Sequence, residues 1–562
     1  PQASPMEVVK FNLIATFFSS LYRMYQCKTI SFIIVLLISI IVQMNAEDAS
    51  SLTYVWPLPA QSISGSQVVS LDPSLSLVTY GPGGRSEILK AALQRYKKII
   101  FKHSSSRRET PAGSSVRRLM YDITRLKVTV QSDDEELHLG LDESYSLLVA
   151  VEEGNSIVEE VSIEANTVFG ALRGMETFSQ LCTFDYTTKN VYIYNAPWYI
   201  QDKPRFSYRG LLLDTSRHFL PTDVIKGIIE SMSYAKLNVL HWHIIDEQAF
   251  PLEVPSFPKL WEGSYSNSER YTVEDALDIV RFAKMRGINV MGEIDVPGHA
   301  ESWGIGYPDL WPSRSCREPL DVSKNFTFDV IDGILTDLRK IFPFELFHLG
   351  GDEVNTGCWN STPHVKQWLH DRNISTEGAY QYFVLKAQEI AISKNWTPVN
   401  WEETFTAFGS KLSPQTVVHN WLRDDVCEKA VARGFKCIFS NQGYWYLDHL
   451  DVPWDAVYQT EPLHGIHKAS EQDLVIGGEV CMWGETVDTS DIQQTIWPRA
   501  AAAAERLWSS REATSSVDFN ETALPRLLKF RCLLNERGVA AAPVTNFYAR
   551  QPPIGPGSCY FQ

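Results

Sequence analysis

Several features that would each define a class of protein are missing from this sequence of 562 residues. No two of its nine cysteines stand in the C-x-x-C spacing of a structural zinc site. No glycine-rich phosphate-binding motif follows a predicted strand, and no serine nucleophile elbow is present. No basic cluster offsets the net charge of -16. The sequence therefore argues against a zinc-finger protein, a nucleotide-binding enzyme, an esterase or protease, and a nucleic-acid-binding protein.

What the chain does contain is enough apolar material for a large core. Hydrophobic residues make up 44% of it and aromatic residues 12%, which excludes disorder across the whole chain. Its length exceeds that of one average domain, so we expect two folded units behind a leader.

The N-terminal segment 1–46 is predicted to carry a signal peptide. From Met24, a short polar stretch precedes the apolar run Ile30–Val42 and the small residue Ala46. As a helix this run spans ~20 Å, short of the ~30 Å hydrocarbon core of a bilayer. Cleavage is therefore favoured over a membrane anchor, although a start further upstream, at Met6, would favour the anchor.

The cysteines and five glycosylation sequons agree with passage through the secretory pathway. The sequons begin at Asn325, Asn360, Asn373, Asn395 and Asn520. Proline follows Thr362 and Thr397 and weakens two of them. We expect the vacuole as the destination, with the cell exterior as the alternative, and no stable membrane insertion.

The segment 47–203 is predicted to be a small α/β domain without catalytic residues. Strand-like runs at Leu126–Val130 and Tyr145–Val151 alternate with a helical pattern at Thr167–Leu181. The polar stretch Ser104–Val116 is typical of a loop or a disordered insertion.

The segment 204–562 predicts a (β/α)8 barrel with a C-terminal tail. Short runs that are apolar on both faces are typical of buried parallel strands. We place them at Arg209–Asp214, Asn238–Ile244, Asn289–Val296, Leu346–Glu353, Thr397–Glu403, Thr416–Leu422, Lys436–Gln442 and Val475–Trp483. Helical patterns between them include Asp223–Lys236, Val273–Arg286 and Ala379–Ser393. A doubly wound open sheet is the alternative, which the missing phosphate-binding motif disfavours.

Carboxylates, histidines and aromatic residues recur where these strands end, at the edge where barrel enzymes carry their active sites. They are Asp214, Arg217, His218, His241, His243, Asp246, Glu247, Glu293, Asp295, His299, His348, Asp352, Glu353, Trp401, Glu402, Glu403, Asn420, Trp421, Tyr444, Tyr446, Asp448, Trp483 and Glu485. Carboxylates supply general acid and base, and aromatic rings pack against the C–H faces of sugars. Together they indicate cleavage of glycosidic bonds.

Other interpretations of these residues stay open at this point. His241 and His243 could be structural hydrogen-bonding groups or, with Asp246 and Glu293, metal ligands, but His-x-His spacing alone is a weak indication of metal. The pair Asp352–Glu353 could cap a helix. Because Gly350 and Gly351 allow a close approach of backbone or ligand, catalysis is favoured for the pair.

Three motifs give the chain a resemblance to a known family. His348-Leu-Gly-Gly-Asp-Glu-Val354, Asp214-Thr-Ser-Arg-His218 and His241-Trp-His243 resemble the β-N-acetylhexosaminidases of glycoside hydrolase family 20, in particular plant members related to the animal lysosomal subunits. The resemblance runs from about Tyr54 to Cys559. It implies a small non-catalytic α/β domain before a (β/α)8 barrel, exo action on terminal N-acetylglucosamine and N-acetylgalactosamine of N-glycans and chitooligosaccharides, and neither cofactor nor metal.

The resemblance also implies a retaining, substrate-assisted mechanism without a protein nucleophile. Glu353 would protonate the leaving oxygen and later activate water, while Asp352 would hold the acetamido N–H. If both lay in an extended strand, their side chains would point to opposite faces, which agrees with the absence of an acid–nucleophile pair.

The remaining roles are carried over in the same way. Arg217 would bind the 3- and 4-hydroxyls, with Glu485 sharing the latter, and Asp246 and His299 would orient the catalytic pair. An aromatic wall around the sugar and its acetamido group would consist of Trp401, Trp421, Trp483 and Tyr446. Asp448 would face the 6-hydroxyl and repel 6-sulfated sugars.

The resemblance further implies disulfides between Cys316 and Cys358 and between Cys532 and Cys559. Cys427 and Cys437 are a guessed pair, and Cys182 and Cys481 are left unassigned. The small domain has no internal cysteine pair, unlike the animal pattern, so a homodimer of the animal type stays open.

Two other functions compete with the exo-glycosidase. A sugar-binding protein on the same barrel would have no need of both Asp352 and Glu353. An endo-chitinase is disfavoured because Arg217 and Glu485 would block an extended substrate. We therefore expect glycan substrates as partners and no nucleic acid.

Overall fold

The computed structural model describes residues 54–104, 121–150, 152–153, 156–157, 160–515, 518–545 and 559. The predicted signal peptide and all but the first residue of the expected loop 104–116 lie outside this part of the chain. Residues 54–562 form one compact unit. Among the described residues, no helix combines the length and apolar character needed to cross a bilayer.

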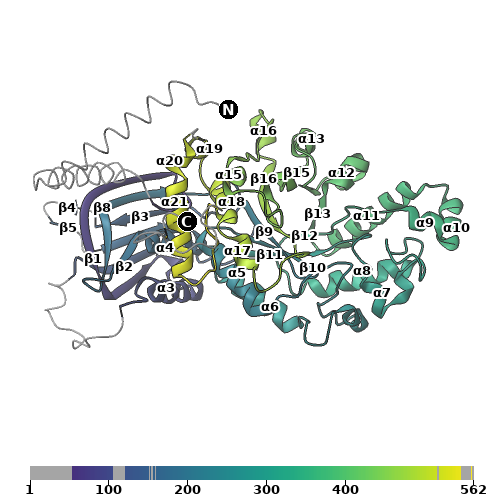
Figure 1. Cartoon of the computed structure of the whole chain (residues 1–562), viewed down its shortest axis with the longest axis horizontal. Helices are drawn as coiled ribbons and strands as arrows, with labels where there is room; N and C mark the ends of the chain where they lie inside the picture. Colours follow the sequence, from purple (N-terminus) through teal and green to yellow (C-terminus); the bar gives the residue numbers. More distant parts are fainter. Residues whose placement is uncertain are drawn as a thin grey trace, which may run out of the picture. The chain divides into compact units, whose positions relative to one another are not determined.

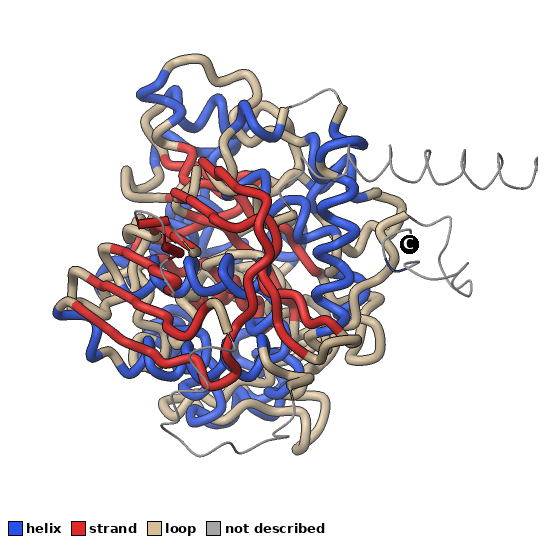
Figure 2. The backbone as a smooth tube through the Cα atoms, turned by 90° about the vertical axis from the view of Figure 1, so that its left-hand side faces the viewer, coloured by secondary structure: helices blue, strands red, loops and turns tan. Residues whose placement is uncertain are grey.

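The N-terminal part of this unit is built on a six-stranded sheet with the order β1-β2-β6-β3-β8-β7 (Figures 1 and 2). The strands are β1 (Gln61–Tyr80), β2 (Ile123–Val130), β3 (Tyr145–Val149), β6 (Glu160–Ala165), β7 (Cys182–Asp185) and β8 (Asn190–Asp202), and a short pair, β4 (Glu152–Glu153) and β5 (Ser156–Ile157), stands apart. The long strand β1 pairs with β2 in parallel and with β8 in antiparallel orientation. Helices α3 (Glu87–Ile100) and α4 (Val168–Leu181) share the apolar core of this sheet.

The C-terminal part is a closed barrel of eight parallel strands, which confirms the predicted fold. Its strands are β9 (Tyr208–Asp214), β10 (Val239–Ile245), β11 (Asn289–Ile294), β12 (Leu346–His348), β13 (Thr397–Trp401), β14 (Val417–Asn420), β15 (Lys436–Phe439) and β16 (Val475–Met482). Nearly every strand residue is buried, because each strand has the barrel interior on one face and helices on the other.

Helices follow the strands around the barrel (Figure 1). The longer ones are α5 (Thr222–Tyr234), α6 (Val273–Lys284), α8 (Asn325–Leu338), α10 (Pro363–Arg372), α11 (Thr376–Ser393), α18 (Arg499–Trp508) and α21 (Leu524–Glu536). Shorter α-helices are α7 (Trp303–Gly306), α9 (Gly357–Ser361), α12 (Glu402–Phe408), α13 (Val426–Ala432), α14 (Gln442–Trp445), α15 (Trp454–Gln459), α16 (Ala469–Gln472), α17 (Ile492–Ile496), α19 (Arg511–Thr514) and α20 (Phe519–Thr522). The 3-10 turns are η2 (Pro82–Arg85), η3 (Pro258–Gly263), η4 (Pro308–Leu310) and η5 (Gly409–Lys411).

One expectation about the fourth barrel strand is wrong. The strand was expected to extend to Glu353, but β12 ends at His348. Gly350, Gly351 and Glu353 have φ angles of 61°, 96° and 51°. A Cβ atom on Gly350 would lie 1.9 Å from a carboxylate oxygen of Asp295, so the chain turns here and only glycine fits. The argument that Asp352 and Glu353 point to opposite faces of an extended strand therefore does not apply.

Buried ion pairs join the two parts of the chain. Glu143, just before β3, lies 2.8 Å from Arg173 of α4 and 2.6 Å from Arg209 of β9. Lys236, which follows α5, bonds to Asp202 at the end of β8 over 2.8 Å. All of these side chains are at most 5% exposed, so they hold the barrel and the sheet together in a low-dielectric environment.

Candidate active site

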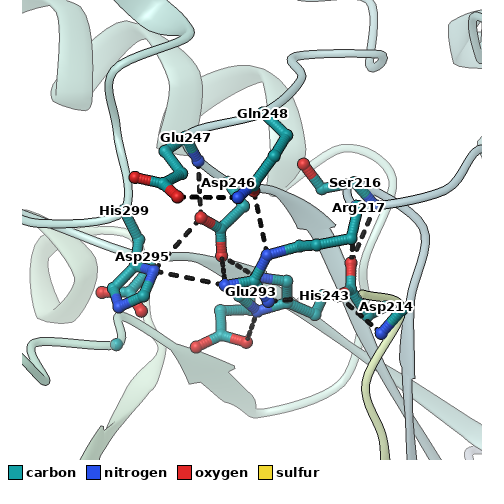
Figure 3. A network of polar contacts seen from close by, with 12 residues as sticks. Asp214, Ser216, Arg217, His243, Asp246, Glu247, Gln248, Glu293, Asp295 and His299 are labelled. Atoms are coloured by element: carbon teal, nitrogen blue, oxygen red, sulfur yellow. Dashed lines mark hydrogen bonds and ion pairs between the residues drawn. The ribbon is translucent and has the colours of Figure 1, made fainter. Parts of the chain in front are cut away.

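Most of the predicted site residues stand just after the C-terminal ends of the barrel strands. Arg217 follows β9, Asp246 follows β10 and His299 follows β11, and the three side chains meet as shown in Figure 3. Asp352 and Glu353 follow β12. The aromatic and remaining acidic residues follow or end the other strands, namely Trp401, Trp421, Tyr446, Asp448, Trp483 and Glu485.

Arg217 is held by carboxylates on several sides. Its guanidinium lies 3.1 Å from Asp214, 2.8 Å from Asp246 and 3.6 Å from Glu485. It also lies over the ring of Trp483, 5.4 Å from the centroid. Burial opposes the charge, but the carboxylates outweigh it and raise the pKa of Arg217 above its usual range. A fixed cation beside the half-exposed Glu485 can bind neighbouring hydroxyl groups of one sugar.

His299 connects Asp246 to Asp352 and Glu353. Its Nδ1 lies 3.1 Å from Asp246 Oδ1, and its Nε2 lies 3.5 Å from both Asp352 Oδ2 and Glu353 Oε2. Burial opposes protonation, but Asp295 and Asp352 outweigh it and raise the pKa of His299 far above its usual range. The ring is therefore an imidazolium that faces both carboxylates.

The two adjacent carboxylates have different environments. Asp352 is buried, and its Oδ1 has no hydrogen-bond partner among the described residues. The side chain of Glu353 is 59% exposed, and its hydrogen bond with His299 lowers its pKa. A buried acceptor without a partner is costly, so Asp352 is prepared to accept a donor from a ligand, while Glu353 can reach solvent and a leaving group.

The predicted aromatic residues form one cluster beside this pair. Trp421 and Tyr446 stack with an interplanar angle of 8° and a centroid distance of 6.1 Å. Trp483 lies 6.0 Å from both Trp401 and Tyr446. Trp401 and Tyr446 are buried, whereas Trp421 and Trp483 are partly exposed. Their faces can enclose a small apolar group and part of a sugar ring.

Asp448 stands two positions after Tyr446 on the same segment. Burial raises the pKa of its carboxyl to about 6. Its Oδ1 is buried without a hydrogen-bond partner in the described structure, and His449 lies 3.8 Å from its other oxygen.

Three acidic residues near the pair received no catalytic role from the sequence. Burial, followed by the charge of Asp352, raises the pKa of Asp295 well above its usual range. The same two causes raise the pKa of Glu403 to about 8. Glu403 accepts a hydrogen bond from Trp421 Nε1 over 3.0 Å. Glu293 lies at the centre of a buried histidine cluster in the barrel interior. The sequence analysis noted these residues within the runs Trp-Glu-Glu and Glu-Ile-Asp. Which groups surround each of them, however, follows only from the tertiary contacts.

Three groups in the described part of the chain place possible metal-ligating atoms within 4.8 Å of one another. They are His241, His419 and Glu479; His241, Glu293 and His348; and Asp295, His299 and Asp352. In the first group a hydrogen bond of 2.8 Å joins His241 Nδ1 to Glu479, and in the second His348 Nδ1 lies 2.7 Å from Glu293. These are hydrogen-bond distances, which favour the structural interpretation of His241.

Three disulfides are present among the described residues. Cys316 bonds to Cys358, Cys427 to Cys437 and Cys532 to Cys559, while Cys182 and Cys481 are free. The first bridge ties the segment of Glu318, which accepts hydrogen bonds from the backbone of His299 and Ala300, to the helix that follows Glu353.

Comparison with known proteins identifies related chains. Residues 206–511 match the model of the glycosyl hydrolase family 20 catalytic domain, and residues 55–181 match a model described as beta-acetyl hexosaminidase like. Beta-hexosaminidase 1 of Arabidopsis thaliana is 70% identical over 92% of this chain and 95% of its own length. The human beta-hexosaminidase subunit beta is 36% identical over 87% of this chain and 88% of its own length. A solved chitobiase from Flavobacterium johnsoniae aligns with a TM-score of 0.75 and 28% identity, over 86% of this chain and 73% of that one.

Proposed function

Because the chain belongs to glycosyl hydrolase family 20 and is a glycoside hydrolase of the β-hexosaminidase type, we propose that it removes terminal β-linked N-acetylglucosamine and N-acetylgalactosamine from the non-reducing ends of N-glycans and chitooligosaccharides. The observation that carries the proposal is the unpaired, buried Oδ1 of Asp352. It stands beside the accessible Glu353 and the aromatic cluster.

The mechanism follows the substrate-assisted route of the family. The acetamido oxygen of the bound sugar attacks the anomeric carbon as the glycosidic bond breaks, and Glu353 gives its proton to the leaving oxygen. Asp352 accepts the hydrogen bond of the acetamido N–H and stabilises the cationic oxazolinium intermediate. Glu353 then removes a proton from the water that opens this intermediate, which regenerates the acid and retains the configuration.

The other predicted residues set which end of a glycan enters. Arg217 and Glu485 bind the 3- and 4-hydroxyls of the terminal sugar and leave no room for a further sugar there. Asp246 and His299 orient the catalytic pair. Trp401, Trp421 and Trp483 enclose the acetamido group and the sugar face, and the hydroxyl of Tyr446 binds the acetamido oxygen.

The first test is hydrolysis of a chromogenic N-acetyl-β-glucosaminide between pH 3 and pH 8 by the wild type and by Glu353→Gln. Removal of the general acid should lower kcat by about 10²–10⁴-fold. Glu389→Gln, an exposed change on α11, is the matched control and should leave kcat unchanged. Activity that survives in Glu353→Gln would show that another residue is the acid, and a wild type that binds sugar without turnover would indicate a lectin.

Product analysis separates exo from endo action. The wild type acting on chitotetraose should release only the monosaccharide and the trisaccharide at early times. Early disaccharide would instead support an endo-chitinase.

Asp448 should discriminate against 6-sulfated sugars in a pH-dependent way. Since its pKa is about 6, its negative charge is present above that pH and is lost below it. The turnover ratio of a 6-sulfated to a neutral aryl glycoside should therefore fall as the pH rises through 6, and Asp448→Asn should abolish this dependence. Equal ratios at pH 4.5 and pH 7.5 in the wild type would contradict the assignment.

For location and assembly we propose the vacuole, reached through the secretory pathway, and a homodimer. The disulfides support an oxidising route, with secretion to the cell exterior as the alternative. Light scattering of the purified protein should give twice the mass of one chain, and the mass of a single chain would exclude the dimer.

A further inference from the structure

His243 is a buried histidine with a carboxylate at each ring nitrogen (Figure 3). Its Nε2 lies 2.7 Å from Asp246 Oδ2, and its Nδ1 makes a short contact with Glu293 Oε2. The side chain is 1% exposed. A neutral imidazole carries one N–H only, so two ionised partners require the doubly protonated imidazolium. Although burial opposes it, Glu293 and Asp246 raise the pKa of His243 to about 10.

The inner partner of His243 is fixed within the barrel. Glu293 is on β11, and its oxygens lie 2.7 Å from His348 Nδ1 and 3.0 Å from His241 Nε2. Trp401 Nε1 donates to the same carboxylate over 3.2 Å. Each of these residues belongs to a barrel strand, so Glu293 cannot move without disturbing the strands themselves.

The outer partner of His243 is the residue on which two groups of the site depend. The same Asp246 Oδ2 that contacts His243 lies 2.8 Å from the guanidinium of Arg217. The other oxygen, Oδ1, lies 3.1 Å from His299 Nδ1. Asp246 stands just after β10, outside the strand itself, so its side-chain orientation depends on such contacts.

We propose that His243 is a positioning residue that links Glu293 in the barrel core to Asp246 and thereby fixes Arg217 and His299. The inference rests on the proposed function, in which Arg217 binds the sugar hydroxyls and His299 faces the catalytic carboxylates. It adds a buried cation, His243, behind the orienting pair of Asp246 and His299. His243 itself touches no substrate.

The competing interpretation is that His243 only packs the core, where its ring meets the edge of Trp483 at a centroid distance of 5.0 Å. The two interpretations differ in how a change at His243 combines with a change at Asp246. A positioning residue that acts through Asp246 has little further effect once the carboxylate is gone, whereas independent effects add.

The test is a double-mutant cycle with His243→Gln and Asp246→Asn in the full-length enzyme. His243→Gln in the wild type should lower kcat/KM by about 10–100-fold, as loss of an orienting partner does elsewhere. KM should rise because Arg217 is misplaced, and kcat should fall because His299 is misplaced. In the Asp246→Asn background it should cost less than about threefold. Affinity for N-acetylglucosamine, measured by calorimetry, should show the same coupling without any turnover.

Two controls make the result specific. His370→Gln removes an exposed His–carboxylate contact, 3.6 Å to Asp371, in which the two side chains are 83% and 58% exposed, and should leave kcat and KM unchanged. If the glutamine variant does not fold, His243→Asn takes its place in the double-mutant cycle. Additive effects, or a lower kcat with unchanged KM and sugar affinity, would overturn the proposal, whereas an inactive wild type would overturn the proposed function instead.

Discussion

At the scale of single residues, the pocket contains a carboxyl group, that of Glu403, which stays protonated near neutral pH. Burial and then the charge of Asp352 raise the pKa of Glu403 to about 8 and that of Asp295 well above its usual range. A neutral Glu403 still accepts the hydrogen bond of Trp421, so it supports the aromatic wall without adding a second negative charge beside Asp352.

Glu403→Gln should therefore stabilise the protein in a pH-dependent way. Below the ordinary glutamate pKa of 4.5 both folded and unfolded chains carry the proton; between 4.5 and about 8 only the folded chain does. Folding of the wild type thus weakens as the pH rises through this window, and glutamine removes the effect. The Tm difference between variant and wild type should grow from pH 4 to pH 8, whereas that of Glu389→Gln should stay flat. A constant difference for Glu403→Gln would contradict the raised pKa.

The sequence singled out Asp352 and Glu353 as the proposed catalytic pair but not the conformation of their backbone. The motif with Asp352 and Glu353 could be found from its residues, whereas the left-handed backbone at Glu353 and the close packing of Asp295 against Gly350 could not. The importance of Glu403 could not be predicted either, because its pKa depends on a residue of the neighbouring strand connection.

At the scale of elements, the strands were predictable and their ends were not. Apolar residues on both faces indicated each barrel strand, since all are covered by helices. The run Thr397–Glu403, however, becomes β13 only as far as Trp401, and α12 begins at Glu402. Hydrophobicity does not mark this change, because Glu402 is buried and accepts backbone hydrogen bonds from Trp421 and Leu422.

The connection between the sheet and the barrel depends on Glu143. Its carboxylate neutralises two buried arginines, Arg173 and Arg209, which together hold its pKa below the usual range despite burial. Glu143→Ala would leave both cations buried and unpaired, so the free energy of unfolding should fall by about 3–5 kcal/mol. Urea unfolding at pH 7 measures this loss.

A matched control is the exposed pair of Glu87 and Lys90 on α3, which is solvated on both sides. Glu87→Ala should change the free energy of unfolding by less than about 1 kcal/mol. Equal effects of the two substitutions would show that the buried cluster does not hold the two parts together.

At the scale of the whole molecule, the barrel could be derived from its repeated strand–helix pattern, but the order of the N-terminal sheet could not. The long strand β1 pairs with β2, the next strand along the chain, and also with the distant β8, 110 positions further on. Such pairings depend on contacts between distant segments. The hydrophobic pattern of a single strand does not show which other strand it pairs with.

The surface agrees with the glycosylation expected from the sequence. All five sequon asparagines, Asn325, Asn360, Asn373, Asn395 and Asn520, are exposed. In a eukaryotic secretory host, Asn325→Gln, Asn373→Gln and Asn520→Gln should each remove one glycan step from the mass of the protein. Asn360→Gln and Asn395→Gln should change the mass little, because proline follows their sequons. Intact-mass spectrometry decides, and an unchanged mass for all five variants would contradict the prediction.

The closure of the barrel by its first and last strands also governs when the enzyme first becomes active. Gly484, after β16, donates to Asp214, at the end of β9, across 270 positions of sequence, and Glu485 faces Arg217 in the same place. A ribosome that adds ~5–20 residues per second needs on the order of tens of seconds to make this stretch. During that time the nascent chain gains Arg217 first and Glu353 later, but it still lacks part of its sugar pocket. The sugar pocket as a whole can therefore form only after Glu485 has been translated, when most of the chain has been made.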